Sequence, residues 1–347
     1  MSPAKLAVMR AELEAKGTKA LLVIRNDRIV CEWYAPDHGP KKKHYAASLD
    51  KAVVGGTSLM LALNDGLIAV DDPAARYVPA WKDDPARSSI TIRHLATHSS
   101  GVENASETRD LGRGRARAQN LRELPGWKGA FWRHEPNPFT IARDDAPLIF
   151  APGSEYAYSN TGMAMLAYAV TDALRGTKHE DIRTLLRERI MRPIGIGDDE
   201  WSIGYGETFE TDGLPLVANW GGGTHTAQAV ARVGRLMLRR GNWEGTQLVN
   251  STWIDAVTRC AGTPVPAEPR SEPGTSPGLG WWTNARGAFL PLPTDAYWGH
   301  GAGNQILLVV PELDLIVVRF GSRLGDALAG GAHDFIFKPI VEALLPS

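Results

Sequence analysis

The chain has 347 residues, of which 43% are hydrophobic and 22% are charged, so it lies in the normal range for a globular protein with a large core. Its formal net charge of -1 and sequence pI near 6.8 give no electrostatic reason to expect a nucleic acid or an anionic membrane as a partner. Cys31 and Cys260 have no second cysteine or histidine at metal-ligand spacing, so neither a disulfide framework, a metal site nor a cofactor is predicted.

The N-terminus alternates charged and apolar residues and lacks the continuous apolar segment of a secretion signal. This pattern predicts a cytoplasmic protein for the sequence as written, or a periplasmic or secreted one if a signal peptide has been removed. There is no run of about 18 apolar residues, so no membrane-spanning helix is expected. The sequence does not indicate an oligomeric state.

The chain opens with an amphipathic pattern at residues 3–16, which predicts a helix. Two β-rich runs follow at residues 20–25 and 28–34. Asn26 and Asp27 between them are typical of a tight hairpin turn.

From residue 48 onwards the pattern is mainly helical. Residues 102–150 lack steady periodicity and predict a long excursion with short helices, and residues 263–277 predict a proline-rich surface loop. Helices are predicted at residues 52–64, 92–97, 162–174, 179–192, 226–240 and 251–259.

The C-terminal part resembles the N-terminal part in its pattern. Residues 305–310 and 315–320 predict a second hairpin, and residues 332–345 predict a closing helix. Because an isolated hairpin is marginal in water, both hairpins are expected to share one antiparallel sheet, with residues 281–282 as another strand.

These elements predict an α+β protein in which an antiparallel sheet flanked by terminal helices carries a large, mainly helical inserted lobe. The lobe with the sheet comprises residues 1–52 and 279–347, and the helical lobe comprises residues 53–278. Ser48 falls where the chain passes from one lobe into the other. Clefts between lobes are common sites for small molecules.

Ser48 and Lys51 are three residues apart at the start of a helical pattern, which places hydroxyl and amine on one face. A neutral serine hydroxyl is a poor nucleophile and needs a base within hydrogen-bond reach. Serine also caps helices commonly, and Ser2 and Lys5 show the same spacing at the N-terminus. A catalytic interpretation of Ser48 therefore depends on other stretches of the chain.

Two further stretches support it. Tyr158 and Asn160 lie in a turn at the start of a predicted helix. His300, with Gly301 and Gly303 after it, is predicted on or beside an edge strand, where glycines let a ligand approach the backbone closely.

Together these stretches resemble the serine β-lactamase and penicillin-binding-protein superfamily. The resemblance is greatest to the class C β-lactamase-like branch, which includes family VIII carboxylesterases and D-aminopeptidase-like serine hydrolases. It runs from about residue 21 to residue 345 and also includes the stretches 91–101 and 221–224. The three motifs are Ser48-Leu49-Asp50-Lys51 for Ser-x-x-Lys, Tyr158-Ser159-Asn160 for Tyr-x-Asn, and His300-Gly301 for the third, Lys/His-Thr-Gly-type motif.

The resemblance implies an acyl-enzyme serine hydrolase. Ser48 would be the nucleophile, Lys51 and Tyr158 a shared acid/base pair, and Asn160 an organiser or a hydrogen-bonding group for the substrate. How the lysine and its partner divide the work is disputed within the superfamily.

The N–H of Ser48 is expected to supply one oxyanion donor, and the backbone after His300, between Gly301 and Gly303, the other. Ala302 stands where a strict third motif has glycine, so the register of the second donor stays open. Histidine in place of lysine makes efficient β-lactam hydrolysis less expected, and a purely structural role for His300 is the alternative.

The predicted substrate is a small ester, amide or peptide, with esterase or amidase activity expected first. The alternatives are a D-stereospecific peptidase, a weak β-lactamase, or a non-catalytic binding protein that retains the fold. His94 and His98 are expected to organise their turn. Ser276 fits a Gly-x-Ser-x-Gly pattern but lies in the predicted proline-rich loop rather than in a strand-to-helix turn, so it is expected to be a bystander.

Overall fold

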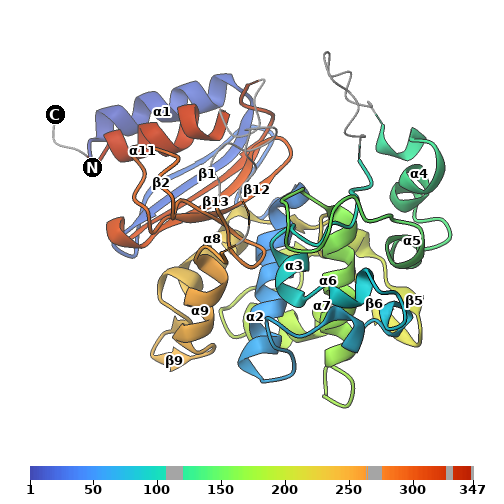
Figure 1. Ribbon diagram of the computed structural model, residues 1–347. Helices are drawn as coiled ribbons and strands as arrows, with labels where there is room; N and C mark the ends of the chain where they lie inside the picture. Colours follow the sequence, from blue (N-terminus) through green and yellow to red (C-terminus); the bar gives the residue numbers. More distant parts are fainter. Residues whose placement is uncertain (107–119, 263, 265–275, 326–330, 345–347) are drawn as a thin grey trace.

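The structure of the chain, a computed structural model, describes residues 1–106, 120–262, 264, 276–325 and 331–344 (Figure 1). It shows a sheet covered by helices beside a mainly helical body.

Within the described ranges, seven strands form one antiparallel sheet. The hairpins from the two ends of the chain pair with each other, with Leu22 opposite Val318, which confirms that they share a sheet. Asn26 and Asp27 have φ values of 49° and 59°, as a tight hairpin turn requires. In order across the sheet the strands are β10 (Ser276–Pro277), β11 (Trp282–Thr283), β12 (Tyr297–Gly301), β13 (Gln305–Val310), β14 (Leu315–Gly321), β1 (Thr18–Arg25) and β2 (Arg28–Tyr34).

Helices cover both faces of this sheet. On one face α1 (Pro3–Ala15) and α11 (Lys338–Glu342) lie side by side, so the two ends of the chain are neighbours (Figure 1). On the other face α8 (Ala227–Leu238) packs against β1, β13 and β14. Side chains alternate accordingly, with Val317 in the cluster under the terminal helices and Val318 in the larger cluster that includes the helical body.

Each helix predicted for the middle of the chain is present with shifted ends. Among the described residues, the further α-helices are α2 (Thr57–Asn64), α3 (Ile92–Ala96), α4 (Gly126–Arg133), α5 (Pro138–Asp144), α6 (Asn160–Ala173), α7 (Ile182–Leu186) and α9 (Ser251–Thr258), with π-helical turns at Arg187–Met191 and His333–Phe337. α2 and α6 lie at the centre of the helical body (Figure 1). Short strands are β3 (His44–Tyr45), β4 (Trp201–Ser202), β5 (Phe209–Thr211), β6 (Leu214–Leu216), β7 (Thr224–His225), β8 (Asn242–Trp243) and β9 (Thr246–Gln247).

Of two predictions near the end of the insertion, one is shifted and the other is wrong. The strand expected at residues 281–282 is present in the sheet as β11 but begins at Trp282, because Gly280 has a φ of +85° and turns the chain against Gly56. Ser276 and Pro277, expected in a surface loop, form the buried strand β10. The rest of that predicted loop, apart from residue 264, lies outside the described residues.

No helix in the described part of the chain combines the length and apolar character needed to cross a membrane. Both cysteines are free. Among the described side chains, no group of three or more histidine, cysteine, aspartate or glutamate residues is arranged to hold a metal ion.

Candidate active site

Ser48 lies in a sharp turn between the sheet and the helical body. It belongs to a 3₁₀ turn, Ala47–Leu49, which continues into a π-helical turn, Lys51–Gly56, and then into α2. Ala47 has a φ of 51°, a left-handed conformation that costs a non-glycine residue roughly 1–2 kcal/mol. The predicted helix at residues 52–64 is thus preceded by a 3₁₀ turn, which is tighter than an α-helix, and opens with a π-helical turn, which is wider. Single π-helical turns are frequent at functional sites.

Lys51 is buried behind Ser48, with 4% of its surface exposed. Its Nζ donates to the Oγ of Ser48 at 3.1 Å, to the Oδ1 of Asn160 at 2.6 Å and to the carbonyl oxygen of Trp220 at 2.7 Å. These three acceptors fix the direction of the amine toward Ser48.

Tyr158 reaches the same oxygen from the other side. Its hydroxyl donates to the Oγ of Ser48 at 2.8 Å, and the Nζ of Lys51 lies 4.7 Å from the centre of its ring. Ser159 caps α6 by accepting the N–H of Gly162, which fixes the turn that carries Tyr158. The structure thus brings together all three predicted catalytic side chains.

Asn160, the other member of the second motif, is oriented by Asn104. The Oδ1 of Asn104 accepts the backbone N–H of Asn160 at 3.0 Å and its side-chain amide at 2.9 Å. This leaves the Oδ1 of Asn160 directed at Lys51. Sequence reasoning did not single out Asn104.

His98 supports the turn that holds Tyr158. Its Nδ1 accepts the N–H of Ser159 at 3.2 Å, and its ring lies 4.7 Å from the Tyr158 ring. Burial, together with the nearby charge of Lys51, lowers the pKa of His98 to about 3, so the ring is neutral near pH 7. The sequence predicted that His98 organises its own turn, and the structure adds the turn of Tyr158.

Strand β12 packs directly against the nucleophile turn through its glycines. A Cβ on Gly301 would lie 2.2 Å from the carbonyl oxygen of Ala46, and Gly299 faces the same way. Because side chains alternate along a strand, His300 points to the opposite face, where its Nε2 lies 3.3 Å from the Nδ2 of Asn304. The backbone at Gly301, rather than the ring of His300, is what the strand presents to the nucleophile turn.

β12 lies between β11 and β13 in the sheet, because residues 276–283 add two short strands outside it. β11 pairs only with Tyr297 and Trp298, so among the described strands His300 pairs with β13 alone, as expected for a residue at the edge of a sheet. Gly303 lies in the β12–β13 turn with a φ of +84°, and its carbonyl oxygen accepts from Arg319.

The sequence reasoning missed a buried carboxylate in the first motif. Asp50 accepts hydrogen bonds from the backbone N–H of Gly223 and from His225, and it is fully buried. Two features of the sequence could have indicated this carboxylate: its position between Ser48 and Lys51, and the glycine run at residues 221–223, which allows a close approach of the backbone.

Two other features lie apart from this site. Ser276 is buried in β10, which leads to another strand rather than into a helix, so it lacks the strand-to-helix turn of a nucleophile elbow.

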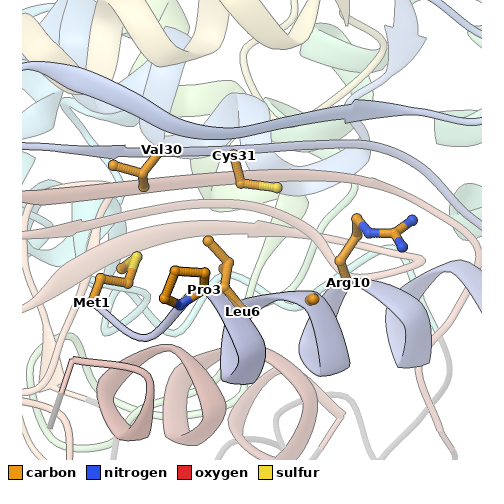
Figure 2. A pocket seen from close by; sticks show the side chains of 7 residues that line it. Met1, Pro3, Leu6, Arg10, Val30 and Cys31 are labelled. Carbon is orange, nitrogen blue, oxygen red and sulfur yellow. The ribbon is translucent and has the colours of Figure 1, made fainter. Parts of the chain in front are cut away.

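A cavity of about 420 Å³ lies between α1 and β2 (Figure 2). It contains none of the predicted site residues and is lined by Met1, Pro3, Leu6, Ala7, Arg10, Val30 and Cys31.

The arrangement at Ser48 has the parts that acyl transfer requires. Ser48 offers a hydroxyl within hydrogen-bond reach of two groups that exchange protons, an amine and a phenol. The turn that carries it lies against a strand whose glycines permit close approach of a backbone.

Comparisons with known proteins agree with this chemistry. The chain is 24% identical over 338 residues to the 6-aminohexanoate-dimer hydrolase of Paenarthrobacter ureafaciens, covering 92% of this chain and 76% of that protein. It is 32% identical over 167 residues to the D-alanyl-D-alanine-carboxypeptidase/endopeptidase AmpH of Escherichia coli (strain K12), covering 45% of this chain and 36% of that protein.

Solved structures share the fold. A penicillin-binding protein homologue from Caulobacter crescentus has a TM-score of 0.71 at 16% identity, covering 99% of this chain and 98% of that chain. A family VIII carboxylesterase has a TM-score of 0.68 at 15% identity, covering 98% of each chain. The predicted fold class is confirmed.

The family model described as Beta-lactamase matches residues 9–337, which is nearly the whole chain. The superfamily predicted from the three motifs is therefore confirmed, and the chain belongs to the β-lactamase family.

Proposed function

We propose that this protein is a serine hydrolase that forms an acyl-enzyme on Ser48 and acts on a small ester or amide. One observation carries the proposal: the Oγ of Ser48 lies 3.1 Å from the Nζ of Lys51 and 2.8 Å from the hydroxyl of Tyr158. A nucleophile in contact with an amine and a phenol, each of which can take its proton once deprotonated, is the constellation that acyl transfer needs.

In the proposed mechanism Ser48 attacks the substrate carbonyl while its proton passes to the Tyr158–Lys51 pair, which acts with Tyr158 as a phenolate stabilised by the nearby charge of Lys51. The same pair then protonates the leaving alcohol or amine, which releases it from the tetrahedral intermediate. In the second half, water loses a proton to the pair and attacks the acyl-enzyme, and Ser48 regains a proton as the acid departs. Asn160 holds Lys51 in position through its 2.6 Å hydrogen bond.

The oxyanion of each tetrahedral intermediate needs two donors. We assign one to the backbone N–H of Ser48 and the other to the backbone between Gly301 and Gly303. The close approach of Gly301 to Ala46 supports this assignment, because it places this strand beside the nucleophile turn.

Labelling with a fluorophosphonate probe, followed by mass mapping, tests the proposal. The expected result is an adduct on Ser48 in the wild type and none in Ser48→Ala. Ser276→Ala is the matched control, since it removes a serine hydroxyl outside the site, and it should label like the wild type. An unlabelled wild type would favour a non-catalytic binding protein that retains the fold.

The substrate class is tested with a panel: a p-nitrophenyl ester, the linear amide 6-aminohexanoate dimer, a D-alanyl-D-alanine peptide and nitrocefin. The linear amide and the peptide are included because the names of the two relatives point to these bonds. We expect ester or amide turnover to exceed nitrocefin turnover. The opposite order would identify a β-lactamase.

A further inference from the structure

We propose that Asp50, Gly223 and His225 form a clamp that holds the nucleophile turn in its reactive shape, with Asp50 and His225 as positioning residues. The inference rests on the proposed function, because it assigns a support to that same site. Asp50 and His225 act through the backbone and are not assigned any contact with the substrate.

Asp50 is the buried centre of the clamp. Its Oδ2 accepts the backbone N–H of Gly223 at 2.5 Å, and its Oδ1 lies 2.8 Å from the Nε2 of His225. Asp50 has 0% and His225 2% of its surface exposed. A carboxylate in such a place is stable only while its partners are present, so the two contacts hold each other in position.

Gly223 connects the two sides of the nucleophile. Its carbonyl oxygen accepts the N–H of Ala46 at 2.9 Å, while its own N–H binds Asp50. Ala46 and Asp50 flank Ser48 at equal distance in the chain, so one residue fixes the backbone before and after it. A Cβ on Gly223 would lie 2.5 Å from the Asp50 carboxylate, which explains why glycine stands there.

The turn needs such a support because Ala47 has the left-handed φ of 51°. A non-glycine residue keeps this conformation only where its surroundings enforce it. β12 packs against the turn at Gly301, and the hydrogen bond between Gly223 and Asp50 holds the turn through a separate contact. Without the clamp Ala47 is free to relax, and the Oγ and N–H of Ser48 move relative to Lys51 and Tyr158.

His225 ties the clamp to the frame of the molecule. It lies on β7, which pairs with β3 at His44 and with β4 at Trp201. The same segment begins with Trp220, whose carbonyl oxygen accepts from Lys51. The segment 220–225 thus fixes Ala46, Asp50 and Lys51 together, so a loosened clamp should slow the chemical step more than it weakens substrate binding.

The test compares Asp50→Ala, Asp50→Asn and His225→Ala with the wild type. Three quantities are measured: kcat and KM for a p-nitrophenyl ester, the rate of fluorophosphonate labelling at Ser48, and the thermal midpoint. For the two alanine variants we expect kcat and the labelling rate to fall about 10- to 100-fold, with KM within about threefold of wild type. Asp50→Asn should recover to within about fivefold of wild type, because an amide can still accept from Gly223 and donate to a neutral His225.

Tyr168→Phe is the matched control. It removes the hydrogen bond from the hydroxyl of the buried Tyr168, eight residues along α6 from Asn160, to the exposed Asp212. This variant should lower the thermal midpoint while kcat and labelling stay at the wild-type level.

Several results would overturn the clamp. One is labelling of folded His225→Ala at the wild-type rate. Another is a rise in KM at unchanged kcat in the alanine variants. A third is an Asp50→Asn variant as slow as Asp50→Ala, which would mean that the charge of Asp50 rather than its hydrogen bonds is decisive. An equal loss of kcat in Tyr168→Phe would mean general destabilisation and would also overturn it. If Asp50→Ala does not fold, Asp50→Asn and His225→Ala carry the test. An unlabelled wild type would instead refute the proposed function.

Discussion

The hydroxyl of Tyr158 lies 2.8 Å from the Oγ of Ser48, although 110 residues separate the two in the chain. Tyr158 comes from the turn before α6, and Ser48 from the turn before α2. Their contact joins the N-terminal ends of two helices of the helical body. Lys51 contacts both residues, the hydroxyl of Ser48 and the ring of Tyr158.

Tyr158→Phe tests the proton path through this contact. The ring and its packing remain, but the group proposed to take the Ser48 proton is lost. We expect kcat to fall about 10²- to 10⁴-fold, the typical contribution of general acid–base catalysis, with a smaller change in KM. Tyr77→Phe is the control, since it removes a hydroxyl that binds Asp72, and it should keep wild-type kcat. Full activity in Tyr158→Phe would refute the assigned path.

Gly301→Ala tests the close approach of β12 to the nucleophile turn. The new Cβ would lie 2.2 Å from the carbonyl oxygen of Ala46, so the strand or the turn must move. A shift of about 1 Å at a catalytic group costs on the order of 100-fold in rate, and we expect a loss of this size in kcat. Gly39→Ala, where nothing lies within 4 Å of the new Cβ, should behave like wild type. Equal kcat values in the two variants would contradict the role assigned to Gly301.

The pH dependence of stability reports on His98. Its pKa is about 3 in the folded state and about 6.5 when unfolded, so the unfolded chain binds more protons between these values and stability falls as pH falls. Between pH 7 and pH 5 this group should remove about 2 kcal/mol of unfolding free energy. In His98→Asn, which keeps an acceptor for the N–H of Ser159, that component is absent. Urea unfolding at the two pH values measures it, and parallel losses in both proteins would contradict the assignment.

Arg319→Lys tests the support beneath the β12–β13 turn. The guanidinium of Arg319 is fully buried, and burial lowers its pKa to about 9. It donates to four neutral oxygens, on Thr18, Gly303, Asn304 and Ser322. A lysine lacks the planar fork that reaches them, so we expect a loss of about 2–4 kcal/mol in unfolding free energy.

Arg232→Lys is the control for this variant, because Arg232 forms a partly exposed ion pair with Glu200. Such pairs contribute about 0–1 kcal/mol, so its thermal midpoint should hardly change. Similar midpoints for the two lysine variants would contradict the role given to Arg319.

Local pattern was sufficient for the elements near the chain ends. Asn26 and Asp27 identified a hairpin turn because few residues adopt positive φ, and an amphipathic pattern identified α1. The strand β10 was missed, because it is two residues long and is defined by its partner β11 rather than by periodicity. The lobe boundaries at residues 52 and 279 stay a prediction.

The sequence by itself determined the residue types that can carry acyl transfer, since Ser48 with Lys51, and Tyr158 with Asn160, stand in short local motifs. Tertiary structure alone decided which atoms meet. The direction of His300 depends on strand alternation and on the neighbours of β12, and the burial of Asp50 depends on Gly223 and His225, more than 170 residues away. Spacing along a chain fixes the relative directions of neighbouring side chains, but contact across long separations is set by how the sheet and the helices pack.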